Sequence, residues 1–501
     1  MKQQTGELFL PFTIDPASSV PLYRQLYESV RQAILAGQLA AGTRLPATRV
    51  LAERVGVSRT TVILAFEQLL SEGYVEGRAG SGTFVASVLP DELLQLSATT
   101  AQVPRTHRQG RGLSQRGNIL ASASVSTVHY YSEARAFRPG IPDLTSFPFK
   151  TWARLEARSW HQPLHDYLGY SHPAGYRPLR EAIAEYVQTA RGVHCSAEQV
   201  LVISGSQQAI DLAARVLLDP GDTAWIEDPG YLGAREALLG AGAHLVPVPV
   251  DNEGLDVSAG IARYPNARMV YVTPSFQFPL GATMSLARRL LLLQWASRTG
   301  AWILEDDYDS EFRYAARPLA SLQGLDTTDQ VIYIGTFSKV LFPGLRLGYL
   351  VVPPDLVDAF TAARAVADRH SPILEQIVLT DFIVQGHFAR HIRLMRELYA
   401  ERQAYLVEVA TRYLDGLLAI HPAEAGMHLV GPLPAGMEDQ AVALRAEQQQ
   451  LITPPLSIYS LETPPIQALL LGYTALTKQE INTGVQRLAQ VLMEMKRLSE
   501  R

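Results

Sequence analysis

Cysteine and long apolar runs are almost absent from this sequence. Cys195 is the single cysteine among 501 residues, which excludes an intramolecular disulfide and a cysteine-based metal site. No apolar run approaches the roughly 20 residues that a membrane-spanning helix needs. The first residues also lack the basic start and apolar core of a secretory signal. We therefore expect a soluble, cytoplasmic protein with no membrane partner.

A strong charge of either sign is missing too. The formal net charge is -5, with 47% hydrophobic and 19% charged residues, which is typical of an ordinary globular protein. Such a chain has no global attraction to nucleic acid, so any contact with DNA must come from a local basic face. The length of 501 residues suggests about two to four domains.

Lysine is scarce, because arginine supplies most of the positive charge. Lys339 stands out because it follows the apolar run 331–334, which predicts a buried strand. A lysine at a strand end can lose its proton and attack a carbonyl, which arginine cannot do. Taken alone, the pair Ser338-Lys339 is more typical of an exposed loop, so the hypothesis of a reactive lysine depends on the rest of the chain. The other lysines are Lys2, Lys150, Lys478 and Lys496.

The first 86 residues carry a helix-turn-helix pattern. Apolar residues at helical spacing predict a helix over Pro21–Leu35. We expect Thr48 to cap a short helix that ends near Val55, and Ser58 to cap a second helix over Arg59–Glu72. A helix, a glycine turn and a capped helix in this order are typical of a DNA-binding motif.

Two short strands are predicted next, at 73–76 and 83–85, joined by a glycine-rich tip that carries Arg78. This hairpin would form a wing, able to lie in the minor groove while the second helix enters the major groove. The alternative is a small helical domain that contacts other proteins. The residues expected to contact DNA are Arg44, Arg49, Ser58, Arg59, Thr60, Thr61 and Arg78.

Residues 20–86 resemble the winged-helix domain of the GntR family of bacterial regulators. This resemblance implies operator DNA as a partner. The matching segments are Pro21–Leu26, Gly42–Pro46, Leu51-Ala52, Ser58–Val62 and Gly80–Val85.

Residues 87–134 are rich in Gln, Ser, Thr, Gly and Ala, which predicts a flexible linker. A basic cluster in this range is more typical of a solvated tether, although it could also contact DNA phosphates non-specifically. The cluster consists of Arg105, His107, Arg108, Arg111 and Arg116.

The remaining residues alternate strand-like and helical patterns. This alternation predicts a mostly parallel sheet covered by helices on both faces. Ligands of such sheets bind at the carboxyl ends of the strands, so the loops after the strands are the candidate site. Strands are predicted at 200–203, 224–226, 245–248, 269–272, 301–304 and 331–334, and helices at 207–217, 232–239 and 286–298.

Several of these loops have side chains suited to a planar, phosphorylated cofactor. Ser204–Gln208 opens a helix whose free N–H groups and dipole favour a phosphate, although alone it is typical of an ordinary helix cap. Tyr231 could stack on a ring or lie in a turn as a partly buried side chain. The loop Thr273–Gly281 could line a pocket, and Thr336, Ser338 and Arg346 could complete the phosphate site.

The loop Glu305–Asp309 gathers four carboxylates and Tyr308 at a strand end. Burying such a group of carboxylates costs free energy unless a cation or a hydrogen-bond donor is present. A pyridinium N–H would supply this partner, and Tyr308 would reach the phenolate oxygen of the same ring. A divalent metal is the rival interpretation, weakened because the loop has no histidine. Together with Lys339 and the phosphate loop, this set indicates pyridoxal 5'-phosphate (PLP).

The chain from about residue 135 resembles fold-type-I aminotransferases, and its fusion to a GntR-like winged helix resembles the MocR subfamily of transcriptional regulators. The implied fold class is multidomain: an N-terminal winged helix-turn-helix (α+β) and an α/β aminotransferase-like domain. The motifs are Tyr170–Gly175, Ser204–Gln208, Glu227–Tyr231, Glu305–Tyr308 and Gly335–Lys339.

The resemblance implies roles for individual residues. Lys339 would be the Schiff-base lysine, Asp306 would face the pyridine nitrogen and Tyr308 the ring oxygen. Choosing Asp306 over Asp307 depends on the resemblance alone. Tyr170 would reach the phosphate of a partner subunit, which implies a domain-swapped homodimer. Tyr231 would stack on the ring, and Ser206, Gln207, Ser338 and Arg346 would hold the phosphate.

One departure from the aminotransferase pattern affects function. These enzymes hold the substrate carboxylate with an arginine ahead of the last helix, whereas residues 447–485 contain no arginine. We therefore expect a transcription regulator that senses PLP or an amino-compound effector, with at most vestigial transaminase activity and with vitamin B6 metabolism as one candidate process. The alternative is an active aminotransferase with an accessory DNA-binding domain.

The expected domains are a winged helix (1–86), a linker (87–134), a large PLP-binding domain (135–353) and a small C-terminal domain (354–501).

Overall fold

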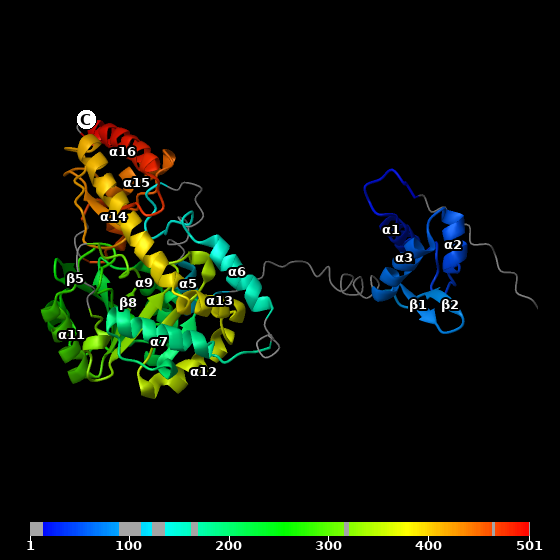
Figure 1. The fold of residues 1–501 in the computed structure, drawn as a ribbon, viewed down its shortest axis with the longest axis horizontal. Helices are drawn as coiled ribbons and strands as arrows, with labels where there is room; N and C mark the ends of the chain where they lie inside the picture. The colour runs from blue at the N-terminus through cyan, green and yellow to red at the C-terminus, as the bar shows by residue number, and fades with distance from the viewer. Residues whose placement is uncertain are drawn as a thin grey trace, which may run out of the picture. The chain divides into compact units, whose positions relative to one another are not determined.

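The computed structural model describes residues 14–89, 112–122, 136–161, 169–314, 320–462 and 466–499. The chain divides into two compact units, residues 1–112 and 113–501, which Figure 1 shows together and which are described separately below. Among the described residues, no helix is long and apolar enough to cross a membrane.

The first unit consists of three helices and a hairpin. These elements are α1 (Leu22–Leu35), α2 (Thr48–Val55), α3 (Arg59–Ser71), β1 (Val75–Arg78) and β2 (Gly82–Val85). The hairpin is antiparallel and pairs Val75 with Val85. Buried Leu26, Val62 and Val85 belong to one apolar cluster, so the wing is packed against the helices by burial of apolar surface.

The predicted cap of α3 is confirmed, because the Ser58 side chain accepts a hydrogen bond from the Thr61 N–H at 3.1 Å. The predicted cap of α2 is wrong. Thr48 is the first helical residue, and Ala47 precedes the helix without a side-chain cap. Ala47 has non-helical backbone angles, φ of -57° and ψ of 142°, and its carbonyl accepts the first helical bond, from Leu51 N–H at 2.9 Å, one residue earlier than expected.

The second unit contains an eight-stranded sheet in the order β3-β10-β9-β8-β7-β4-β5-β6. The pairs from β5 to β9 are parallel, as predicted, and β10 is antiparallel to both its neighbours. β10 was not predicted; it lies between β9 and β3, and β3 is distant in sequence. The strands are β3 (Val200–Ile203), β4 (Thr223–Asp228), β5 (His244–Asp251), β6 (Gly254–Leu255), β7 (Met269–Val272), β8 (Trp302–Asp307), β9 (Val331–Thr336) and β10 (Gly348–Val351).

Helices cover both faces of this sheet, as the alternating pattern predicts. Leu304 and Ile332 share one apolar cluster with residues of α8 and α9, whereas Ile303 and Val331 share another with residues of α11. Successive strand residues therefore face opposite helical layers. The helices of this part are α6 (Phe149–Trp160), α7 (Arg177–Arg191), α8 (Ser206–Leu217), α9 (Leu232–Ala241), α10 (Val257–Arg263), α11 (Leu286–Thr299), α12 (Val357–Asp368) and α13 (Ile373–Val384).

The C-terminal part packs the long helix α14 (His387–Tyr413) along α16 (Lys478–Ser499), as Figure 1 shows in yellow and red. Between them in the chain lie α15 (Asp439–Gln448) and the antiparallel pair β11 (His428–Pro432) and β12 (Ala468–Gly472). Short 3₁₀ helices occur at Ala197–Gln199, Gln323–Leu325, Pro343–Leu345, Pro354–Leu356 and Leu456–Tyr459.

Part of the range predicted to be a linker is helical. Helix α5 (Gln115–Ser122) packs on α9, where a Cβ atom at Gly240 would lie 2.8 Å from Leu120 Cδ2. The apolar pair Ile119-Leu120 gives this short stretch a face to pack, which the polar composition around it obscures. Arg116 lies on this helix, whereas Arg105, His107, Arg108 and Arg111 fall outside the described residues. The proposed domain boundaries stay a prediction.

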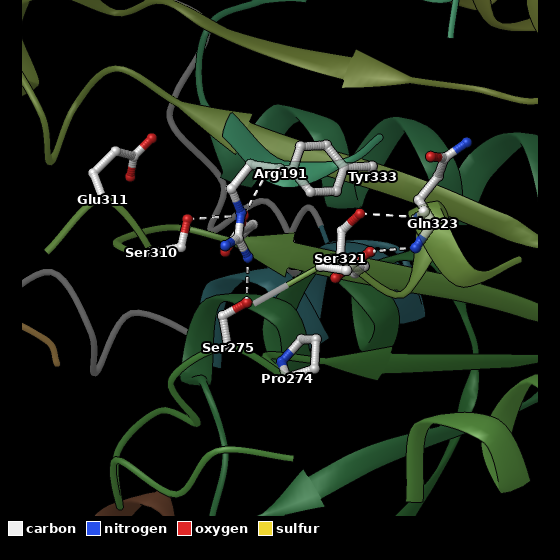
Figure 2. A network of polar contacts seen from close by, with 12 residues as sticks. Arg191, Pro274, Ser275, Ser310, Glu311, Ser321, Gln323 and Tyr333 are labelled. Atoms are coloured by element: carbon white, nitrogen blue, oxygen red, sulfur yellow. Dashed lines mark hydrogen bonds and ion pairs between the residues drawn. The ribbon is translucent and has the colours of Figure 1, made fainter. Parts of the chain in front are cut away.

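A buried ion pair connects α7 to the end of β8. Arg191 Nε lies 2.6 Å from Asp307 Oδ2, and both side chains are at most 5% exposed. Arg191 also donates to Ser275 Oγ at 2.7 Å, and the Tyr333 hydroxyl donates to the same Asp307 oxygen at 2.5 Å. Figure 2 shows Arg191 among Ser275, Ser310 and Tyr333, and its guanidinium links the end of α7 to β8 and to the loop after β7.

We predict that Arg191→Leu lowers the free energy of unfolding by about 3–5 kcal/mol, because it leaves Asp307 charged, buried and unpaired. The double variant Arg191→Leu/Asp307→Leu should be less destabilised than Arg191→Leu alone. All five tryptophans lie in the second unit, so their fluorescence during urea unfolding reports on this unit.

The exposed pair Arg412–Glu408 on α14 supplies the control. Arg412→Leu should change the free energy of unfolding by less than about 1 kcal/mol. An Arg191→Leu variant as stable as the wild type would contradict the importance of the buried pair.

Candidate functional site

Lys339 lies just beyond the carboxyl end of β9, half-buried, with its Nζ donating to the Gly140 carbonyl at 2.9 Å. Gly140 has a φ of 69°, in the left-handed region that favours glycine, and a Cβ atom there would lie 2.9 Å from this nitrogen. Burial lowers the pKa of the Lys339 ammonium, while Asp309 and Asp306 act in the opposite direction. A lowered pKa favours the neutral amine, which is the form that attacks a carbonyl.

Adjacent aspartates of β8 face opposite sides of the sheet. Asp306 accepts hydrogen bonds from the Tyr271 hydroxyl at 2.8 Å and the Ser206 hydroxyl at 3.5 Å, on the same side as Lys339. Asp307 is bonded to Arg191 instead. Burial raises the pKa of Asp306 to about 7. The alternation of the strand therefore separates two residues that composition alone could not distinguish.

The structure separates the four carboxylates of this loop. Glu305 accepts hydrogen bonds from the backbone N–H groups of Leu322 at 2.7 Å and Gln323 at 2.9 Å, away from Asp306. The period-two alternation of β8 divides the group, so that Glu305 and Asp307 have their own partners. Within the described ranges, no cluster of three or more His, Cys, Asp or Glu could hold a metal ion.

Tyr308 has a buried hydroxyl with no hydrogen-bond partner among the residues that the structure describes. Burial raises the pKa of this phenol well above its usual value, so it is a proton donor at neutral pH. A buried polar group without a partner is costly and rare in native proteins. An acceptor atom of a bound ligand at this position would complete its hydrogen bonding.

The Arg346 side chain lies close to the start of α8. Gly205 precedes the helix with φ of 114°, and a Cβ atom there would lie 3.7 Å from the Arg346 guanidinium. Ser206 and Gln207 are the first two helical residues, so their N–H groups belong to the unpaired first turn. A guanidinium beside a helix N-terminus is suited to an anion such as a phosphate.

Some of the other residues predicted to hold the phosphate already take part in hydrogen bonds within the protein. Thr336 is buried, and its hydroxyl accepts a hydrogen bond from Ser338 N–H at 3.2 Å. Gln207 Nε2 donates to the Gly233 carbonyl at 2.8 Å. The Ser338 side chain is half-buried beside Lys339.

Tyr231 lies directly before α9, with its hydroxyl 3.4 Å from Gln207 Oε1. Its ring centroid is 6.5 Å from that of Tyr271 and 5.9 Å from that of Phe278. Tyr231 therefore lies between the start of α8 and an aromatic wall, where a flat ligand ring can contact it.

Tyr170 is in a different environment. Its side chain is 90% exposed, and its ring centroid lies 6.3 Å from that of His370 beside a surface hollow of about 270 Å³. No hydrogen bond or ring contact among the described residues joins it to Lys339 or Arg346. The structure of one chain thus brings together the other predicted cofactor residues but not Tyr170.

These observations fit PLP. The site combines a lysine with a lowered pKa, a buried carboxyl group, an unpartnered phenol and an anion-binding helix start at one edge of the sheet. Two further residues, Gly140 and Tyr271, were not predicted, because they come close to the site only through the fold. Asp309 belonged to the predicted group of carboxylates but could not be given a separate role.

The predicted DNA contacts lie on the first unit. Arg49 and Arg59 are exposed and line a hollow of about 350 Å³. Ser58, Thr60 and Thr61 lie beside them at the start of α3. Arg44 lies against the wing, where a Cβ atom at Gly82 would be 3.2 Å from its Nε.

The Arg78 side chain already has interaction partners within the wing. It forms an ion pair with Glu76 at 2.6 Å, and its guanidinium lies 4.6 Å from the centroid of the Phe84 ring. β1 extends through Arg78, so the tip of the wing is shorter than predicted.

Comparisons with known proteins agree with this architecture. Residues 22–85 match the family of bacterial regulatory proteins described as the gntR family, and residues 140–488 match the family described as aminotransferase class I and II. The chain is 44% identical over 482 residues to the probable rhizopine catabolism regulatory protein MocR of Rhizobium meliloti, covering 96% of both chains.

The chain is also similar to a second regulator and to an aminotransferase of known structure. The uncharacterized HTH-type transcriptional regulator YdeL of Bacillus subtilis is 32% identical over 480 residues, covering 96% of this chain and 98% of YdeL. The crystal structure of LysN, an alpha-aminoadipate aminotransferase from Thermus thermophilus, matches with a TM-score of 0.70 and 30% identity, covering 76% of this chain and 98% of LysN. The chain belongs to the MocR subfamily of GntR-type transcriptional regulators, in which a winged helix is joined to a fold-type-I aminotransferase-like domain.

Proposed function

We propose that this protein is a PLP-binding transcription regulator that binds operator DNA through its winged helix and senses PLP or an amino compound through its second unit. The observation that carries the proposal is that one chain contains a winged helix with exposed arginines and a lysine with a lowered pKa that is under the charge of Asp306, which also accepts a hydrogen bond from Ser206 at the start of α8. The family membership supports both parts.

Each cofactor contact has a proposed role. Lys339 would hold the aldehyde group of PLP, and Asp306 would pair with the pyridine nitrogen, where a protonated ring would favour the ionised carboxylate. Tyr308 would donate to the ring oxygen, and Tyr231 would contact the ring face. The phosphate would be held by Ser206, Gln207, Thr336, Ser338 and Arg346. When bound, PLP supplies an aldehyde that combines reversibly with primary amines, with loss of water.

Tyr170 is proposed to complete the phosphate site of a partner subunit. Its 90% exposure beside a surface hollow supports this role, because the side chain is left accessible to a second subunit. A domain-swapped homodimer would place two winged helices on two half-sites of an operator. Ligand binding could then alter DNA affinity by favouring one arrangement of the subunits. Control of vitamin B6 metabolism remains one candidate process, and the location remains proposed as cytoplasmic.

The cofactor assignment is tested by Lys339→Ala. We predict that the wild type binds PLP with a near-visible absorption band and that the variant lacks this band, because its covalent partner is gone. Lys478→Ala is the matched control, since Lys478 lies on the surface and bonds Glu401. A band that survives in Lys339→Ala would show that the lysine is misassigned.

The DNA assignment is tested by Arg59→Ala. Loss of one phosphate contact should weaken binding to all DNA sequences and reduce the slope of log affinity against log salt by about one. Arg24→Ala on α1 removes the same charge from an exposed position outside the predicted contacts. Equal salt slopes for Arg59→Ala and Arg24→Ala would contradict the proposed interface.

The alternative function is that of an active aminotransferase, favoured by the intact set of Lys339, Asp306 and Tyr308. Absence of arginine from residues 447–485 argues against it. We predict no sustained transamination with a panel of amino acids and 2-oxoglutarate, measured at steady state. Turnover at about 1 s⁻¹ or faster would favour the enzyme instead.

A further inference from the structure

Helix α5 is the first described element of the second unit, and it follows the winged helix in the chain. Ser114 caps this helix, because its Oγ accepts a hydrogen bond from Gly117 N–H at 3.0 Å. A helix of eight residues is only marginally stable in water by itself, and Gly117 inside it lowers the helix propensity further. The formation of α5 therefore depends on the surface against which it packs.

That surface is the end of α9 (Figure 1). Gly240 is buried there, and a Cβ atom at this position would lie 2.8 Å from Leu120 Cδ2. Because Gly240 has no side chain, Leu120 lies directly over the backbone of α9. The Leu120 side chain nevertheless stays 52% exposed, so little apolar surface holds α5 in place. Elements held by so little buried apolar surface open at a low free-energy cost.

The other end of α9 lies at the ligand site. Tyr231, which directly precedes this helix, is assigned to the ring of PLP, and Gln207 is assigned to its phosphate. Gln207 Nε2 donates to the Gly233 carbonyl, in the first turn of α9, at 2.8 Å. A Cβ atom at Gly233 would lie 2.6 Å from the Tyr231 hydroxyl oxygen, so this turn packs without free space against the ligand residues. A ligand that moves Tyr231 or Gln207 therefore moves the start of α9.

One continuous helix joins these two ends. α9 runs from Leu232 to Ala241, so its length is about 15 Å at a rise of about 1.5 Å per residue. Close-packed helices shift as rigid bodies, because the protein interior does not deform continuously. A shift at Gly233 therefore reaches Gly240 and the weakly held α5.

We propose that α9 relays the ligand state of the cofactor site to the linker, because occupation of the site changes how firmly α5 docks on α9. This inference rests on the proposed function, since it needs a ligand beside Lys339 and DNA at the winged helix. The alternative is that α5 stays docked in every ligand state and only attaches the chain to the second unit.

Docking of α5 sets the length of chain between the two units. With α5 docked, residues 86–114 join β2 to the second unit. With α5 released, residues 86–135 join β2 to Ala136, whose carbonyl accepts a hydrogen bond from Ile452 N–H at 2.8 Å. The length of a connection determines the effective concentration of a tethered domain at its binding site. The affinity for an operator with two half-sites therefore changes with the docking of α5.

Hydrogen exchange of the full wild-type chain tests the relay without any substitution. Amide exchange of peptides from α5 is followed by mass spectrometry with and without PLP, and peptides from α11, on the other face of the sheet, are the internal control. We expect PLP to change the exchange rate of α5 by about threefold or more and that of α11 by less. Unchanged exchange of α5, in protein whose near-visible band shows bound PLP, would overturn the inference. A protein without that band would instead overturn the proposed cofactor.

A disulfide that holds α5 on α9 tests whether the docking controls DNA binding. The variant Leu120→Cys/Gly240→Cys is made together with Cys195→Ser, and its two thiols lie close enough to pair. Diamide forms the bond and a phosphine reductant breaks it, so the reduced protein is the matched control. We expect PLP to change operator affinity by less than about twofold in the oxidised form, and by about fivefold or more in the reduced form and the wild type.

The outcomes of this second test separate the two proposals. An oxidised form that keeps the full response to PLP would overturn the relay while leaving the proposed function in place. A wild type that binds PLP with no change in operator affinity would overturn the proposed function itself, and the relay with it.

Discussion

The period-two alternation of β8 is the constraint on which the rest of the second unit depends. It directs Asp306 toward Tyr271, Ser206 and Lys339, and it directs Asp307 toward Arg191 on the opposite face. One aspartate is thereby left for a ligand, and its neighbour is bonded inside the protein. A register shift of one residue would exchange these surroundings and place the charge paired with Arg191 in the ligand site.

Much of the architecture could be predicted from the sequence, because apolar runs and helical spacing are local signals. Strands at 200–203 and 269–272 and the Ser58 cap follow from residues that are neighbours in the chain. Strand β10 and helix α5 could not be predicted in this way, because each depends on a partner distant in sequence. The loops of the site could also be found, since each follows a strand.

The surroundings of individual site residues required the fold. The Gly140 carbonyl reaches Lys339 across 199 positions of sequence, and nothing local marks Gly140 as its partner. Composition likewise could not show that Glu305 and Asp307 have partners of their own, whereas Asp309 Oδ2 lacks a hydrogen bond among the described residues.

The central claim is that the ligand state of the second unit controls DNA binding by the first. It is tested most directly by the affinity of the full chain for its operator, measured with and without PLP at one salt concentration, in the wild type and in Lys339→Ala. The account predicts an affinity change of about fivefold or more in the wild type, which corresponds to a coupling free energy of about 1 kcal/mol, and none in the variant. Equal operator affinities of the wild type with and without PLP, under conditions in which PLP is shown to bind, would contradict this claim.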